Sequence, residues 1–262
     1  MVLDKETAMK DTIYKYNTPL RIALLADLHD REFIWITDSL KTHKPDIICI
    51  AGDVVHRVEL DTDGLVINQT RYVLPFLKAC AEIAPTFMSL GNHEWTLCDE
   101  DIAVMADTGV TILDNSLVRY KDLIIGGLSS AGVTAYREYR KDKTERYPEW
   151  DYGDRPDYTE PDVSWLDNFC KQDGYKILLS HHPEYRDRYL KDMSIDLVLS
   201  GHAHGGQIRL FGQGLFAPGQ GILPKYTSGV HGNMIISKGL ANTAGMVPRL
   251  FNPREVVYIE PV

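Results

Sequence analysis

Five short segments of the sequence carry acidic, histidine or asparagine side chains of the types that bind metal ions. They read D-L-H at 27–29, G-D at 52–53, G-N-H-E at 91–94, H-H at 181–182 and G-H-A-H at 201–204. Carboxylate, imidazole and amide groups, with no thiolate among them, suit divalent ions such as Mn²⁺, Fe²⁺ or Zn²⁺. The chemistry they indicate is metal-assisted catalysis rather than a closed structural zinc site.

A short apolar run precedes each of these segments, and we expect each run to be a strand. Runs that are apolar on both faces are typical of strands buried inside a layered sheet. The runs are LRIALLA (20–26), DIICIA (46–51), TFMSL (86–90), YKILLS (175–180) and IDLVLS (195–200). Amphipathic stretches at 32–44, 71–84 and 162–172 predict helices, and strands alternating with helices predict the α/β class.

The position of the polar segments after the strands predicts that they meet. Ligands of α/β proteins bind in the loops beyond the carboxyl ends of the strands, so we expect all five segments at one edge of one sheet. Residues two apart in extended backbone project to the same side. We therefore expect Asp27 and His29, and likewise His202 and His204, to approach the same point.

The series D-x-H, G-D, G-N-H-E, H and G-H-x-H resembles the calcineurin-like metallophosphoesterase superfamily, from about residue 20 to the C-terminus. The resemblance implies a four-layer αββα sandwich, which we expect to be a single domain over residues 1–262. It also implies two divalent ions, for which Mn, Fe or Zn are candidates. Together these dications outweigh the charge of two aspartates, so the pocket would attract a phosphate even in an acidic protein.

The resemblance also assigns roles to individual residues. Seven side chains would be metal ligands, with Asp53 shared by both ions: Asp27, His29, Asp53 and His204 for the first, and Asp53, Asn92, His181 and His202 for the second. His93 would be the catalytic acid that donates a proton to the leaving oxygen, and Glu94 would support the loop. Two ions that clamp a bridging water would activate it for attack at phosphorus.

One subgroup is more similar than the rest. GHAHGGQIRL (201–210), FAPGQGILPKYTSGV (216–230) and RLFNPREVVYIE (249–260) resemble bacterial phosphodiesterases that carry a GHTHGGQ motif. The expected reaction is therefore hydrolysis of phosphodiesters by a metal-bridging hydroxide. The expected substrate is a small phosphate ester, or a diester derived from lipid or cell wall.

Two alternatives stay open. A phosphomonoesterase, including a protein Ser/Thr phosphatase, would have GDxVDRG where this chain has GDVVHRV (52–58), and an arginine where it has Leu90. Arg57 is retained, but the second phosphate-clamping arginine is missing, which disfavours this reading. A non-catalytic binding scaffold of the same fold would lack His93 or several ligands, and this chain keeps them.

Composition limits the remaining choices. With 37 acidic and 28 basic residues the net charge is −9, which predicts no nucleic-acid surface and no attraction to anionic lipid. The sequence has no apolar run long enough for a signal peptide or a membrane anchor, so we expect a cytoplasmic protein. Residues 132–165, rich in tyrosine and charge and without a clear period, are expected to be an insertion that forms a lid over the metals.

Overall fold

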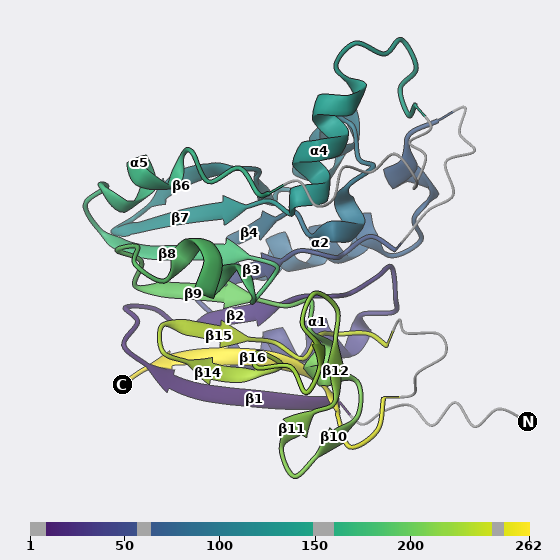
Figure 1. Cartoon of the computed structure of the whole chain (residues 1–262). Helices are drawn as coiled ribbons and strands as arrows, with labels where there is room; N and C mark the ends of the chain where they lie inside the picture. The colour runs from purple at the N-terminus through teal and green to yellow at the C-terminus, as the bar shows by residue number, and fades with distance from the viewer. Residues whose placement is uncertain (1–8, 57–63, 149–159, 243–248) are drawn as a thin grey trace, which may run out of the picture.

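The computed structural model describes residues 9–56, 64–148, 160–242 and 249–262, and most of its strands form two six-stranded sheets (Figure 1). The first sheet has the order β1 (Met9–Tyr16), β16 (Arg254–Pro261), β2 (Ile22–Leu25), β3 (Ile47–Ala51), β4 (Thr86–Ser89) and β5 (Thr111–Leu113). The second has the order β14 (Gly229–His231), β15 (Met234–Ile236), β9 (Leu197–Ser200), β8 (Tyr175–Ser180), β7 (Leu123–Leu128) and β6 (Ser116–Tyr120).

The strands are apolar on both faces because each face meets a different layer. In β2, Ile22 and Leu24 belong to a core cluster between the two sheets, whereas Ala23 and Leu25 face the helices of the first sheet. The other central strands divide in the same way, as the two-residue period of a strand requires. The core between the sheets therefore consists of side chains from both of them.

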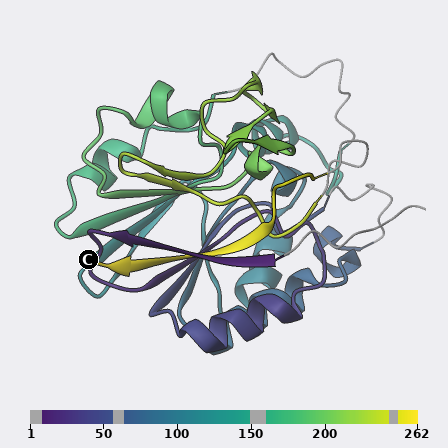
Figure 2. The same cartoon turned by 90° about the horizontal axis from the view of Figure 1, so that it is seen from below.

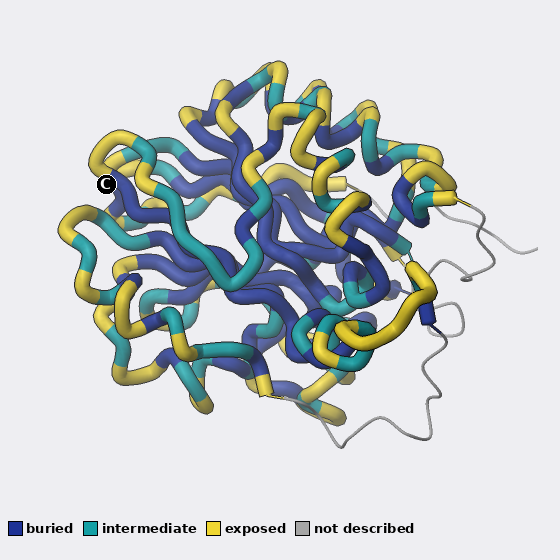
Figure 3. The backbone as a smooth tube through the Cα atoms, turned by 90° about the horizontal axis from the view of Figure 1, so that it is seen from above, coloured by how far each residue is buried: buried dark blue, intermediate teal, exposed yellow. Residues whose placement is uncertain are grey.

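Helices cover the outer face of each sheet. On the first sheet lie α1 (Ile34–His43), α2 (Val73–Ile83) and α3 (Asp99–Ala106), and Figure 2 shows α1 along its outer side. On the second lie α5 (Leu166–Cys170) and a π-helical turn (Arg186–Leu190). Figure 3 shows the strands buried inside and the exposed turns around them. This arrangement confirms the expected four-layer αββα sandwich.

The five predicted strands and three predicted helices are all present, but helices α3 and α4 and the other strands were not predicted. Helix α4 (Ala131–Arg140) begins where we expected an insertion without a period. The side chain of Tyr136 is fully buried and packs edge-on against Trp95, with ring centroids 4.8 Å apart. Residues 149–159 of the expected lid lie outside the described residues, and the lid stays a prediction.

Between β9 and β14 the chain forms two short hairpins. The first pairs β10 (Arg209–Leu210) with β11 (Gln213–Gly214), and the second pairs β12 (Phe216–Ala217) with β13 (Gly221–Ile222). None of the helices in the described part of the chain is both long and apolar enough to cross a membrane. The expected cytoplasmic location stays a prediction.

Candidate metal centre

The predicted ligands come from both sheets, not from one. Asp27 and His29 follow β2, Asp53 follows β3 and Asn92 follows β4, all in the first sheet; His181 follows β8, and His202 and His204 follow β9, in the second. The expectation of a single sheet was wrong because local sequence does not record which strands pair. The carboxyl ends of parallel strands in the two facing sheets lie at the same edge of the sandwich.

Asp27, His29 and His204 form one group, in which one ligand atom of each lies within 4.8 Å of the others. The Oδ1 atom of Asp27 is 3.5 Å from Nε2 of His204 and 3.8 Å from Nε2 of His29. The two imidazole rings stack with centroids 5.2 Å apart. All three side chains are buried, so this group is a compact, water-poor set of one carboxylate and two imidazoles.

Asp53, His181 and His202 form a second group with the same spacing. The Oδ2 atom of Asp53 lies 3.1 Å from Nε2 of His181 and 3.8 Å from Nε2 of His29, which belongs to the first group. The rings of His181 and His202 are 5.0 Å apart. Asp53 therefore lies between the two groups and can contact both.

The backbone at these positions is not extended, which corrects part of the sequence reasoning. Asp27, His29, Asp53, His202 and His204 all have a positive φ between 45° and 65°. Side chains rarely adopt this left-handed conformation, which costs about 1–2 kcal/mol per residue and clusters at functional sites. The side chains two apart do converge, but tight left-handed turns bring them together rather than strand alternation.

Two glycines allow the loops to approach this closely. A Cβ atom at Gly91 would lie 2.3 Å from Oδ1 of Asp53, and one at Gly201 would lie 2.8 Å from Oδ2 of Asp27. Neither position has room for a larger residue without moving a carboxylate. The close approach of these carboxylates therefore explains why G-N-H-E and G-H-A-H each begin with glycine.

The Glu94 side chain holds together the loops that carry Asp53 and Asn92. Its fully buried carboxylate accepts hydrogen bonds from the backbone N–H groups of Gly91 (2.7 Å), Asp53 (2.8 Å) and Val55 (3.0 Å). Burial, together with the nearby charge of Asp53, raises the pKa of Glu94 to about 7. These contacts agree with the supporting role expected for this residue.

Electrostatics leave most of the histidines neutral. Burial lowers the pKa of His29, His202 and His204, so each ring has a lone pair available at neutral pH. His181 differs: burial opposes its charge, but the Asp53 carboxylate 3.1 Å away outweighs burial and raises the pKa of His181 to about 10. Metal binding at His181 must therefore displace a proton.

The donor set fits divalent metal ions. Both ring nitrogens of His29 and Oδ1 of Asn92 are buried and have no hydrogen-bond partner within the described ranges. A buried polar atom without a partner costs about 1–3 kcal/mol, so several in one place require an explanation. A cation bound among these nitrogens and carboxylates would satisfy them. His181 is already oriented for this, because its Nδ1 atom donates to the carbonyl oxygen of Ala51 at 2.6 Å.

His93 lies beside the two groups and is more exposed than they are. Its side chain is 24% exposed, and its Nε2 atom is 3.9 Å from Oδ2 of Asp53. Its backbone N–H donates to Oδ1 of Asp53 at 2.8 Å. Burial lowers the pKa of His93, although Asp53 opposes this shift. A partly exposed histidine next to the two groups can be reached from solvent.

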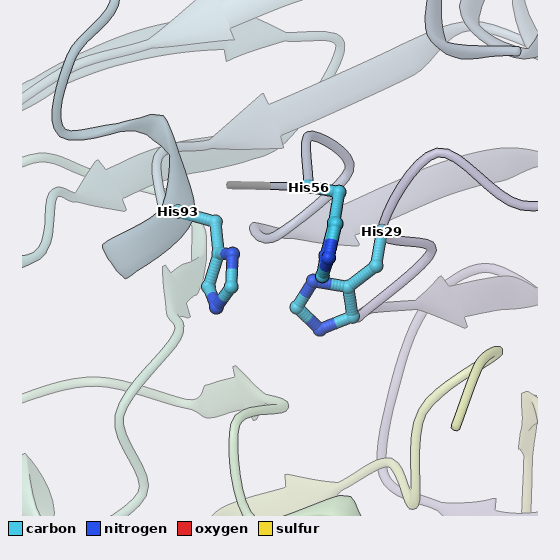
Figure 4. Close-up of side chains that lie close together, drawn as sticks. All are labelled: His29, His56 and His93. Atoms are coloured by element: carbon cyan, nitrogen blue, oxygen red, sulfur yellow. The ribbon is translucent and has the colours of Figure 1, made fainter. Parts of the chain in front are cut away.

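His56 is a neighbour that the sequence analysis did not include. Figure 4 shows the side chains of His29, His56 and His93 close together, with His93 facing the other two. The rings of His56 and His93 are nearly parallel with centroids 5.8 Å apart, and His29 lies 5.9 Å from His56. His56 could have been found from the sequence, because it stands three residues after Asp53 in the same loop. Arg57, which follows it, lies outside the described residues.

A hydrogen-bonded chain of side chains was also missed. The Oγ atom of Ser130, at the start of α4, is 2.8 Å from Nε2 of His182, whose Nδ1 atom is 3.2 Å from Oε1 of Glu184. The same Glu184 oxygen is 4.0 Å from Nε2 of His202. This chain connects α4 to the second group. The adjacent pair His181–His182 gave the signal, but nothing in the sequence pointed to Ser130.

Comparisons with known proteins agree with this geometry. The sequence model of a family described as calcineurin-like phosphoesterase matches residues 20–206. An uncharacterized metallophosphoesterase of Helicobacter pylori is 29% identical over 201 residues, which cover 74% of this chain and 47% of that protein. Phosphodiesterase YaeI of Escherichia coli is 27% identical over 202 residues, covering 73% of this chain and 63% of YaeI.

The chain spans about half the length of the first of these relatives. Among solved structures, the NAD nucleotidase NadN of Haemophilus influenzae aligns with a TM-score of 0.42 and 16% identity. That alignment covers 71% of this chain and 38% of NadN.

Proposed function

Because this chain belongs to the calcineurin-like phosphoesterase family, we propose that it hydrolyses phosphate esters, with a preference for phosphodiesters, at a centre of two divalent ions. The family is metal-dependent, and the clusters of histidine and aspartate could bind metal ions. We propose that these ions are Mn, Fe or Zn, because the donors are imidazoles, carboxylates and an amide.

The observation that carries the proposal is the place of Asp53 between two ligand groups. Its Oδ2 atom is within 4 Å of both His29 and His181, which belong to different groups. In the proposed centre Asp27, His29 and His204 would hold the first ion, His181, His202 and Asn92 would hold the second, and Asp53 would be shared by both. The two ions, when bound, would lower the pKa of a bound water and neutralise phosphoryl oxygens.

The other residues act on the substrate and on the loops. In the proposal His93 donates a proton to the leaving oxygen, since it is partly exposed and its Nε2 atom lies 3.9 Å from Oδ2 of Asp53. Its backbone N–H at the same time fixes the orientation of Asp53, and Glu94 fixes the backbone around both. The loops thereby hold the ligands before any ion binds.

The preference for diesters is supported by two observations. YaeI, which is similar to this chain over 202 residues, is named as a phosphodiesterase. The residue before G-N-H-E is Leu90, which is fully buried and offers no charge to clamp the additional negative oxygen of a monoester. A diester, with one charge fewer, does not need that second cation.

A paired hydrolysis assay tests this function. The protein is stripped with a chelator, reconstituted with Mn²⁺, Fe²⁺ or Zn²⁺, and given bis-p-nitrophenyl phosphate and p-nitrophenyl phosphate side by side. Faster, metal-dependent release from the diester supports the proposal. Faster release from the monoester would favour a phosphatase, and release from neither, with metal bound, would favour a binding scaffold.

A further inference from the structure

Three neighbouring turns next to the metal centre expose large apolar side chains. We call the set the apolar turns: the tip of the β10–β11 hairpin, the β12–β13 hairpin and the turn before β16. Phe211 is fully exposed, while Ile222 is 82% exposed and Phe251 is 80% exposed. The members with large exposed side chains are Leu210, Phe211, Phe216, Ile222, Leu223, Leu250 and Phe251. Such a concentration of exposed apolar surface marks an interaction site.

Backbone hydrogen bonds join the three turns into one surface. The N–H of Arg209 donates to the carbonyl oxygen of Leu250 at 3.0 Å, which connects the first hairpin to the turn before β16. The N–H of Leu215 donates to Ile208, and that of Leu223 donates to Leu215, both at 2.9 Å. Figure 1 shows the β10–β11 hairpin projecting from the body of the molecule.

The backbone holds the apolar side chains outward. Phe211, Leu223 and Phe251 have φ values of 51–53°, in the left-handed region that large side chains rarely adopt. Each of the three lies at a turn, and each remains exposed rather than folding onto the core. Left-handed turns that end in an exposed apolar side chain recur at three places here, which points to use of these side chains by a partner.

Charge along this part of the chain is segregated. The segment 201–254 contains no aspartate or glutamate, so all 37 acidic residues lie outside it, and it contains five basic residues. Arg209 and Lys225 flank the apolar turns. The Arg209 guanidinium bonds to the carbonyl oxygens of Gly205 and Gly212, whereas Lys225 pairs with Asp187 at 2.7 Å. A net charge of −9 therefore hides a segment in which every charged residue is basic.

The apolar turns are attached directly to the turn that carries His204. Asn252, next to Phe251, donates through Nδ2 to the carbonyl oxygen of His204 at 2.7 Å. Nη1 of Arg209 donates to Gly205, the next residue along, at 2.8 Å. Whatever binds the apolar turns therefore lies beside the metal centre.

We propose that the apolar turns dock this protein peripherally on an anionic phospholipid surface. Separate apolar side chains at the tips of turns, on a segment that contains basic residues and no aspartate or glutamate, can insert between lipid headgroups. A protein partner would instead require a continuous face of complementary shape. The docking does not depend on the proposed hydrolysis, since it uses none of the metal ligands. It would bring lipid phosphates close to the metal centre.

Flotation with vesicles tests the proposal without any turnover. The full chain is mixed with vesicles of phosphatidylcholine, and with vesicles of equal parts phosphatidylcholine and phosphatidylglycerol. We expect it to float with the anionic vesicles, and to float less in high salt. The double variant Phe211→Ser, Phe251→Ser should lose about tenfold or more in binding while its metal content and melting temperature stay unchanged.

Val262→Ser is the matched control, because Val262 is 88% exposed but lies at the other end of β16, about 26 Å away along the strand. It should float like the unaltered chain. If the double variant does not fold, Ile222→Ser on the second hairpin replaces it. The proposal is overturned if no vesicle binds, if Val262→Ser loses as much binding as the double variant, or if the apolar turns mediate only a dimer in solution.

Discussion

Replacing His93 with alanine should separate proton donation from metal binding. The His93 ring is partly exposed beside Asp53, and the backbone N–H that holds Asp53 remains in the alanine variant. We therefore expect unchanged metal content. For an ester with a poor leaving group, loss of a general acid should lower kcat by about 10²–10⁴-fold, or roughly 3–5 kcal/mol in the barrier. For a p-nitrophenyl ester the loss should be much smaller, because that leaving group departs without a proton.

The measurement is kcat for a series of aryl and alkyl esters of increasing leaving-group basicity, with the variant His43→Ala as control. His43 lies at the end of α1 with its ring stacked on Tyr258, 4.1 Å away, and its removal should leave kcat unchanged. Equal losses across the whole series would refute the role of His93 as the acid. So would a loss of metal together with activity.

The same variant gives a prediction for pH. Burial lowers the pKa of His93 below its usual value of 6.5, and the protonated fraction falls as the pH rises through that pKa. The advantage of the unaltered chain over His93→Ala should therefore be largest at acid pH and shrink by up to about tenfold for each further pH unit. An advantage that grows with pH would contradict proton donation by His93.

Three further predictions concern the metal ligands and the loops. Asp27→Asn weakens a carboxylate that contacts His204 and accepts the His202 N–H, so calorimetry should show metal affinity reduced by about tenfold or more. Gly91→Ala places a Cβ atom 2.3 Å from Oδ1 of Asp53, so urea titrations should show the free energy of unfolding lowered by about 1–3 kcal/mol. The control is Gly64→Ala, where a Cβ atom has nothing within 4 Å and the free energy of unfolding should change by less than about 0.5 kcal/mol. Chelation should lower the melting temperature, since an ion at 100 times its Kd stabilises the folded state by about 2.7 kcal/mol; an unchanged melting temperature would mean that no ion was bound.

Local sequence was sufficient for the five strands that precede the polar segments, and it pointed to the aspartates and histidines that the structure brings together. The runs before Asp27 and His202 are apolar on both faces, which only a strand covered on both sides requires. Aspartate, histidine and asparagine stand directly after such strands, and the carboxyl ends of these strands are where α/β proteins bind their ligands. Both features are local in the sequence, and both are present in the structure.

Features that depend on distant contacts were not predictable. Which strands share a sheet depends on pairing across long stretches of chain, so the five polar segments were expected to follow strands of one sheet, whereas they follow strands of two. The left-handed backbone at Asp53 is imposed by its surroundings, since aspartate has no strong preference for it. Helix α4 is held by Tyr136 packing on Trp95, a contact between segments about 40 residues apart.

Net charge led to an expectation that the proposed docking would overturn. The value of −9 is a sum over the chain, and from it we expected no affinity for anionic lipid. All acidic residues lie outside 201–254, so the part of the chain that carries the apolar turns does not share the average. Charge is informative when it is read along the sequence as well as summed.

Counting the metal ions bound to the chain and to Asp53→Asn tests the central proposal most directly. Asp53 lies 3.1 Å from His181 and 3.8 Å from His29, and in the proposed centre it serves both ions. Native mass spectrometry after reconstitution should find two ions on the unaltered chain, and fewer on Asp53→Asn together with a loss of hydrolysis. An Asp53→Asn protein that keeps two ions and full activity would contradict a bridging role for Asp53 and, with it, the dinuclear centre proposed for this edge of the sandwich.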